Sequence, residues 1–181
     1  YQSYPCQWLI EWRPTSMLFE KPHGDNGDFT VEAMSSLGNP MLWWVGVIAL
    51  AVIIYCTFVR RDWRAGVILV GYLGLWAPWL LYWYRTIFMF YMVVLTPFLA
   101  LAVTYLIGLF LGLLRPYPEP LLACRDQLVA PSRRTPDIAV SMGIALVIVI
   151  LLVALFIYPV VSGMPIPYSH WGWRMWFSSW I

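Results

Sequence analysis

The sequence predicts an all-α fold, that of a polytopic helical membrane protein. Four long apolar runs cover residues 40–59, 65–83, 86–114 and 138–161. Each has the roughly 20 residues that a helix needs to cross the hydrocarbon core of a bilayer. Because lipid offers no partner for backbone N–H and C=O groups, such runs form helices. Composition agrees, since 11% of the residues are charged, against about 25% in an ordinary soluble domain.

Arginine and tryptophan separate the two sides of the membrane. Seven of the ten arginines follow the first and third runs, and eleven of the twelve tryptophans lie on the opposite side. Since arginine-rich loops stay in the cytoplasm, we expect a plasma-membrane protein whose segments 1–39 and 162–181 are both extracytoplasmic. The turn at Tyr84–Arg85 lies on the same outer side. The net charge of +2 therefore reflects topology and gives no reason to expect a nucleic-acid partner.

Two outer segments flank the spans. In residues 1–39 we expect an interfacial helix over Pro5–Trp12, whose tryptophans share one face, followed by a hairpin that turns at Asn26-Gly27. Residues 162–181 form a tail with four tryptophans. The chain begins at Tyr1 without a signal peptide. We therefore expect further transmembrane helices before it, because something must export the outer N-terminal segment.

Local features refine the spans. Asn39 is a typical N-cap for the first span, and Pro78 should kink the second in its outer third. The third run would be about 43 Å long if wholly helical. That length exceeds the bilayer core, so this run must tilt, bend near Pro97 or enter a protein cavity. In the loop before the fourth span, a short piece over Leu121–Val129 is expected to lie on the surface.

Several signatures of enzyme chemistry are absent from the sequence. It has no Cys/His metal spacing, no phosphate-binding glycine loop and no serine or cysteine nucleophile motif. We therefore expect no cofactor. Every acidic residue lies outside the spans or at their ends, which disfavours a proton relay inside the membrane. Glu11 and Arg13 are expected to form a weak surface pair.

Arg85 is the leading candidate for binding. It lies in a short outer turn with Tyr82 and Tyr84, at the depth of lipid headgroups. A guanidinium there can bind a lipid phosphate through two parallel N–H···O bonds. The alternative is an arginine that only anchors the helix end by extending its charge to the interface. The residues leave both interpretations open.

The outer tryptophans also allow two interpretations. Each can serve as an interface anchor. An excess on one side also suits a surface that binds sugar rings or extended peptides, because such ligands pack on aromatic faces. As candidate acceptor or sugar contacts we single out Trp8, Arg13 and Trp79.

Three stretches, read together, resemble the protein O-mannosyltransferase family. Tyr1–Trp8 resembles a family stretch in which Ser-x-Pro precedes a Trp-rich run, although Cys6 stands where the family often has Trp. Ser36–Trp44 resembles the Leu-Gly-Asn-Pro-x-x-Trp-Trp entry to a late transmembrane helix, and Tyr82–Tyr91 resembles an aromatic segment around an arginine. The Arg60–Gly66 loop and the terminal Trp-Arg-Met-Trp run resemble the actinobacterial branch.

This resemblance implies the C-terminal transmembrane helices of a GT-C glycosyltransferase, with the N-terminal transmembrane part of the same enzyme as partner. The enzyme would move mannose from polyprenyl-phosphate mannose, its donor substrate in membrane lipid, to serine or threonine hydroxyls of exported acceptor proteins. The family's catalytic Asp-Glu pair is expected upstream of Tyr1, so this segment holds no catalytic residue and is inactive alone. Arg85, Tyr82 and Tyr84 would bind the lipid phosphate.

Two other classes of function stay open at this point. One is a non-catalytic membrane scaffold subunit, which would explain the shortage of acids but not the family-ordered motifs. The other is a GT-C transferase that acts on a lipid or a glycan instead of a protein. The physics fits transfer from a lipid phosphate, because the attacking hydroxyl needs a carboxylate base and the departing phosphate needs positive charge.

Overall fold

The computed structural model describes residues 2–23, 30–82, 84–114 and 137–181. Within these ranges four helical spans are long and apolar enough to cross a membrane, and this confirms the predicted polytopic, all-α fold class. They are α2 (Pro40–Phe58), α3 with α4 (Trp63–Leu81), η1 with α5 (Met89–Phe110) and α6 (Asp137–Ser162). The expected hairpin turn at Asn26-Gly27 and the surface piece over Leu121–Val129 lie outside the described residues.

Asn39 caps α2, as the sequence predicts. Its side-chain oxygen accepts hydrogen bonds from the backbone N–H groups of Met41 (3.1 Å) and Leu42 (3.2 Å), which a helix start otherwise leaves unpaired. The Asn39 amide also donates to the carbonyl of Ile150 in α6, at 2.7 Å. One side chain therefore fixes the start of α2 and ties it to α6.

The opposite end of α2 turns tightly into α3 (Trp63–Trp76). Arg61 has a left-handed backbone (φ 53°), and Asp62 caps α3. The buried Asp62 carboxylate accepts hydrogen bonds from the Arg64 guanidinium (3.0 and 3.1 Å) and from the Tyr105 hydroxyl (2.8 Å). Burial alone would raise the pKa of Asp62, but these hydrogen bonds hold it below its ordinary value. The turn is thereby attached to α5 (Thr96–Phe110).

The second span breaks at Pro78, as predicted. Trp76 ends α3, and the short helix α4 (Pro78–Leu81) continues the span with Pro78 in its first turn. Proline cannot donate the backbone hydrogen bond that would continue α3, so the helix is interrupted there. This break sets the course of the chain toward the turn that contains Arg85.

The third span is shorter than the predicted run 86–114, and it is not one α-helix. It begins as a 3₁₀-helix, η1 (Met89–Leu95), and becomes α5 only at Thr96. Pro97 lies in the first turn of α5, where its missing N–H breaks no helical bond. Side chains three apart share a face of a 3₁₀-helix, and Met89, Met92 and Leu95 accordingly form the buried face of η1.

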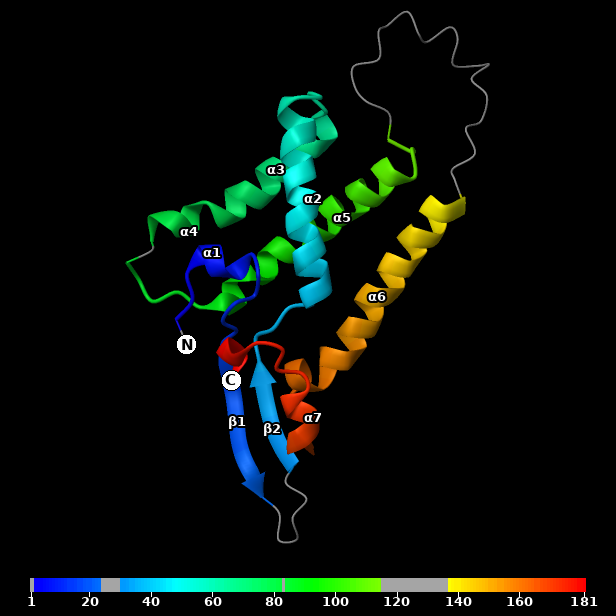
Figure 1. Ribbon diagram of the computed structural model, residues 1–181. Coiled ribbons are helices and arrows are strands. Elements are labelled where there is room, and N and C mark those ends of the chain that lie inside the picture. Colours follow the sequence, from blue (N-terminus) through cyan, green and yellow to red (C-terminus); the bar gives the residue numbers. More distant parts are fainter. Residues whose placement is uncertain (1, 24–29, 83, 115–136) are drawn as a thin grey trace, which may run out of the picture.

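A small antiparallel sheet extends from one end of the helices (Figure 1). Its strand order is β1 (Ser16–His23), β2 (Thr30–Ser35), β3 (Ile166–Pro167). The alternation in β2 buries Val31 and Ala33 against Val160 of α6 and Trp171 of α7 (Tyr168–Gly172). The segment after α6 therefore joins the strand pair β1–β2 through β3, which the sequence pattern does not predict.

The tail ends in an aromatic cluster that joins the two terminal segments and the first turns of α2. Its rings are centred 5.3 to 6.1 Å apart and come from Trp12, Trp44, Trp176, Phe177 and Trp180. The Trp180 indole N–H also donates to the carbonyl of Glu11, at 2.7 Å, and the Ser179 hydroxyl donates to the carbonyl of Trp12. The tail is thus packed onto the chain that precedes the first span.

Candidate functional site

The turn between α4 and η1 forms a pocket around Arg85. A hollow of about 280 Å³ is lined by Trp79, Tyr82, Arg85, Thr86, Ile87 and Tyr91. The turn is closed by a hydrogen bond of 2.9 Å from the Arg85 backbone N–H to the Tyr82 carbonyl. The structure therefore brings together three of the predicted site residues: Trp79, Tyr82 and Arg85. We call this hollow the Arg85 pocket.

One wall of the Arg85 pocket is a stack of aromatic rings. Trp79 stacks on Tyr91, with centroids 4.6 Å apart and an interplanar angle of 22°. Trp8 meets Trp79 edge to face at 5.7 Å, and its own indole N–H donates to the Ser3 hydroxyl (3.1 Å). Ser3 in turn donates its backbone N–H to the carbonyl of Ile87 (2.9 Å). The wall is therefore braced by α1 (Pro5–Trp8), α4 and η1.

The charge in this pocket is exposed and available to an anion. Among the residues that the structure describes, no carboxylate pairs with the Arg85 side chain. The hydroxyl groups of Tyr82 and Thr86 add two neutral hydrogen-bond donors to the same lining. One guanidinium, two hydroxyls and an aromatic wall can bind a phosphate and pack a ring or chain beside it.

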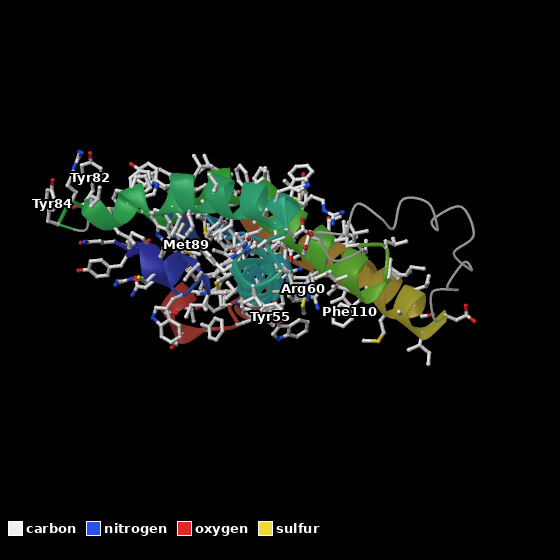
Figure 2. The ribbon with its side chains drawn as sticks, turned by 90° about the horizontal axis from the view of Figure 1, so that it is seen from above. Tyr55, Arg60, Tyr82, Tyr84, Met89 and Phe110 are labelled. Carbon is white, nitrogen blue, oxygen red and sulfur yellow. The ribbon has the colours of Figure 1, made fainter. Side chains whose placement is uncertain are left out.

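The remaining predicted residues lie around the pocket instead of in its lining. Tyr84 is 74% exposed and contacts only the edge of the site through the Tyr82 ring, at 6.5 Å. Trp8 is completely buried, so it supports Trp79 from behind and presents no free face to a sugar. Arg13 is exposed outside the pocket lining. Figure 2 shows Tyr82 and Tyr84 together at the tip of α4, far from Arg60.

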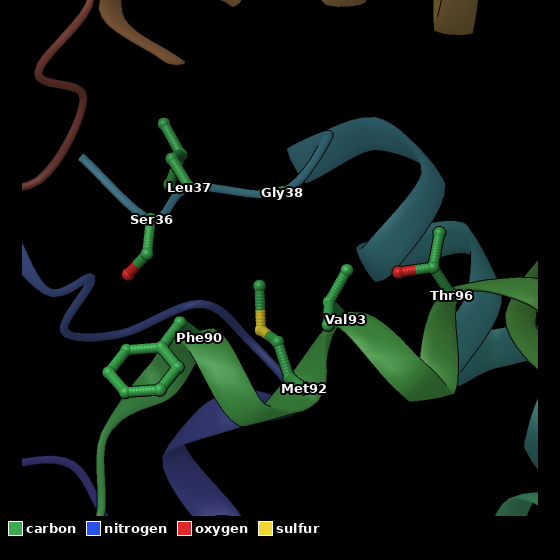
Figure 3. Close-up of a pocket in the computed structure, with 7 residues that line it drawn as sticks. All are labelled: Ser36, Leu37, Gly38, Phe90, Met92, Val93 and Thr96. Atoms are coloured by element: carbon green, nitrogen blue, oxygen red, sulfur yellow. The ribbon is translucent and has the colours of Figure 1, made fainter. Parts of the chain in front are cut away.

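A second, apolar hollow lies beside η1. Tyr91 lines the Arg85 pocket, while Phe90, Met92 and Val93 of η1 and Thr96 at the start of α5 line this second hollow, which has a volume of about 400 Å³. The linker Ser36–Gly38 forms the facing side (Figure 3). No charged side chain lines this second hollow, which therefore suits an apolar group.

Glu11 is a feature that sequence reasoning missed. The expected surface pair with Arg13 is absent: Glu11 is completely buried, Arg13 is exposed, and no ion pair joins them. The Gly38 backbone N–H approaches the carboxyl group, but neither oxygen receives a well-formed hydrogen bond among the described residues. Burial raises the pKa of Glu11 to about 8, and the Gly38 N–H offsets this only in part.

The backbone explains why Glu11 points inward. The predicted helix over Pro5–Trp12 ends early, because α1 stops at Trp8 and Glu11 takes a left-handed conformation (φ 55°). Backbone hydrogen bonds from Glu11 to Trp8 (3.2 Å) and from Trp12 to Gln7 (3.0 Å) close the helix in the way usual for a left-handed terminal residue. That position usually holds glycine, and the sequence holds glutamate there, so no sequence signal marks the end of the helix.

Comparison with known proteins finds relatives along the whole chain. It is 29% identical over 184 residues to the polyprenol-phosphate-mannose–protein mannosyltransferase of Mycobacterium tuberculosis (strain H37Rv). It is 31% identical over 183 residues to the enzyme of the same name from Mycolicibacterium smegmatis (strain MKD8). Each match covers 99% of this chain and 32% of the relative, so the chain spans about a third of the length of the curated relatives it matches. No family model and no solved structure matches the chain.

Proposed function

We propose, from this homology to protein mannosyltransferases, that the chain is the C-terminal part of such an enzyme. The whole protein then transfers mannose from polyprenyl-phosphate mannose to serine or threonine hydroxyls of exported proteins. The homology over 99% of the chain is the observation that carries this proposal. A scaffold role or a lipid or glycan acceptor is not favoured, because the curated relatives are named protein mannosyltransferases.

The role we propose for the Arg85 pocket is to bind the phosphate of the donor. When the mannosyl group leaves, negative charge grows on that phosphate, and a preorganised guanidinium stabilises it. Tyr82 and Thr86 line the same hollow, and in this proposal their hydroxyls donate to the same oxygens. The apolar hollow on the other side of η1 suits the isoprenoid chain of the same lipid. The general base is supplied by the part of the enzyme outside this chain.

The proposed orientation puts the Arg85 pocket on the extracytoplasmic side of the plasma membrane. The turn with Arg60, Arg61 and Arg64 lies at the opposite end of α2 from the sheet (Figure 1), as the positive-inside rule requires. Donor phosphate and exported acceptor then meet on the outer face. Both ends of this chain lie on that face as well.

The test uses purified full-length enzyme in lipid vesicles, with polyprenyl-phosphate mannose as donor and a serine- or threonine-containing peptide as acceptor. Arg85→Ala should lower kcat/KM roughly 10- to 150-fold, which corresponds to about 1.5–3 kcal/mol, the contribution of a hydrogen bond to a charged group. Arg85→Lys should restore activity only in part, because an ammonium keeps the charge but loses the planar fork. Arg60→Ala, an exposed arginine at the other end of the molecule, is the matched control.

Two outcomes separate the parts of this proposal. No mannose transfer by the wild-type protein to any peptide would overturn the function itself. Full activity of Arg85→Ala at saturating and limiting donor would remove Arg85 from the donor site. Complete rescue by Arg85→Lys would favour the helix anchor, since lysine extends its charge to the interface equally well.

A further inference from the structure

The strand β1 is an open edge of the outer sheet. The strand order β1-β2-β3 leaves β1 paired on one side only, so along its other side the described chain provides no strand partner. Regular pairing with β2 is confined to Leu18, Phe19 and Glu20, because the register shifts on both sides of this stretch. Along an antiparallel strand, successive residues alternately direct their N–H and C=O groups to one side and the other. This stretch therefore presents backbone groups to a further strand.

Apolar side chains accompany this open edge. Met17, Leu18 and Phe19 are 54%, 39% and 45% exposed in a strand that lies outside the four candidate membrane spans. Proteins usually protect an edge strand with charge, proline or a bulge, because an exposed apolar edge recruits other chains. In β1 the charged Glu20 and Lys21 and Pro22 provide such protection at the far end, and Phe19 packs its ring on Trp171 at 5.4 Å. The unprotected part of the edge is therefore the short stretch at Met17 and Leu18, whose side chains are exposed. Such an edge is suited to a short, reversible contact with an extended chain.

The near end of β1 leads to the Arg85 pocket. Thr15, immediately before the strand, accepts a hydrogen bond on its hydroxyl from the backbone N–H of Met89, at 3.4 Å. Met89 lies between Ile87 and Tyr91, both of which line the pocket. A peptide added along β1 would therefore run toward the segment where we place the donor phosphate.

We propose that the edge of β1 binds the acceptor polypeptide by strand addition and guides its hydroxyl-bearing residue toward the Arg85 pocket. This inference rests on the proposed function. Backbone pairing recognises an extended chain with little regard to its side chains, which suits an enzyme whose acceptors are segments of different exported proteins. The apolar side chains of Met17 and Leu18 add contacts that favour apolar residues next to the modified one.

The first experiment changes the peptide and leaves the enzyme intact. Acceptor peptides with one hydroxyl residue carry a single backbone N-methyl group at successive positions, which removes one N–H donor at a time. Full-length enzyme should show a KM raised roughly three- to tenfold at alternate positions within a short stretch, with kcat unchanged. An effect without this period of two, or no effect along the peptide, would overturn strand addition.

The second experiment identifies the occupant of the edge without requiring mannose transfer. A photo-crosslinking residue replaces Leu18 in the full-length enzyme in vesicles, and a biotin-labelled acceptor peptide is added. Crosslinks to the peptide that an excess of unlabelled peptide abolishes support the proposal. Crosslinks to a second copy of the enzyme or to another segment of the same chain overturn it. If the wild-type enzyme transfers no mannose, the proposed function is wrong. The crosslinking experiment still shows in that case which chain occupies the edge of β1.

A matched pair of enzyme variants completes the test. Leu18→Lys introduces charge at the edge, and Met164→Lys does so at another exposed apolar side chain of the outer surface, 47% exposed. Leu18→Lys should raise KM for the peptide several-fold at unchanged kcat, whereas Met164→Lys should leave both constants unchanged. Equal effects of the two variants would show that the edge has no special role.

Discussion

Replacing Glu11 by glutamine should stabilise the protein at neutral pH. The carboxyl group of Glu11 is completely buried without a well-formed hydrogen bond, and its pKa is raised from 4.5 to about 8. Below pH 4.5 the group is protonated in both the folded and the unfolded chain, so its burial carries no ionisation cost. As pH rises from 4.5 to 8, the unfolded chain ionises while the folded chain must keep the proton. Stability is therefore lost across this window.

The size of the effect follows from the same values. Each pH unit between the two pKa values corresponds to about 1.36 kcal/mol. About 2.5 units separate the ordinary pKa from pH 7, so holding the proton at pH 7 costs about 3 kcal/mol. Glutamine has nearly the same shape and no ionisation, so Glu11→Gln should recover most of this free energy at pH 7 and almost none at pH 4.5.

The assay is thermal unfolding of the full-length enzyme in detergent, followed by tryptophan fluorescence between pH 4.5 and pH 9. Trp180, whose indole donates to the Glu11 carbonyl, reports on this region. The matched control is Glu20→Gln, which removes an exposed carboxylate from the same outer segment. A midpoint difference between Glu11→Gln and wild type that stays constant with pH, or a loss of stability at pH 7, would refute the reasoning.

Three further predictions concern the membrane orientation, the activity of this segment alone and the hydrogen bond between Tyr105 and Asp62. Cysteine at position 169 should react with a membrane-impermeant reagent in intact cells, whereas cysteine at position 60, an exposed residue of the arginine-rich turn, should react only after the membrane is opened; labelling of position 60 from outside would reverse the topology. Residues 1–181 alone should transfer mannose on the order of 10²–10⁴ times more slowly than the whole enzyme, because the base is missing; robust turnover would mean that an outer carboxylate of this segment is the base. Tyr105→Phe should lower stability by about 1.5–3 kcal/mol in a denaturant titration, because Asp62 loses a hydrogen bond, and an unchanged midpoint would show that this bond contributes nothing.

The spans could be predicted from the sequence because lipid imposes a strong, simple requirement on the backbone. Apolar length alone indicated each crossing, and Asn39 and Pro78 marked a helix start and a break by chemistry that does not depend on the rest of the fold. The turn with Arg85 and Tyr82 could also be singled out, because a charged residue between two apolar runs is visible in the sequence.

Features that depend on tertiary packing could not be predicted. The run Met89–Leu95 is apolar throughout, so no periodicity distinguishes a 3₁₀-helix from an α-helix. The burial of Glu11 depends on one left-handed residue, and the two residues of β3 are too few to show alternation. The aromatic wall of the Arg85 pocket comes from Trp79 and Tyr91 and is braced by Trp8 of α1, which is distant in sequence, so its residues could be proposed one by one but not as a group.

The attachment of the tail to the first outer segment has a consequence for biosynthesis. The carbonyl groups of Glu11 and Trp12 receive their hydrogen bonds from Trp180 and Ser179, which leave the ribosome only after all four spans. The N-terminal segment must therefore wait, incompletely folded, until α6 has been inserted. Chaperones and proteases on its side of the membrane have this interval in which to act, and a nascent chain stalled before α6 would expose the unfinished segment to both.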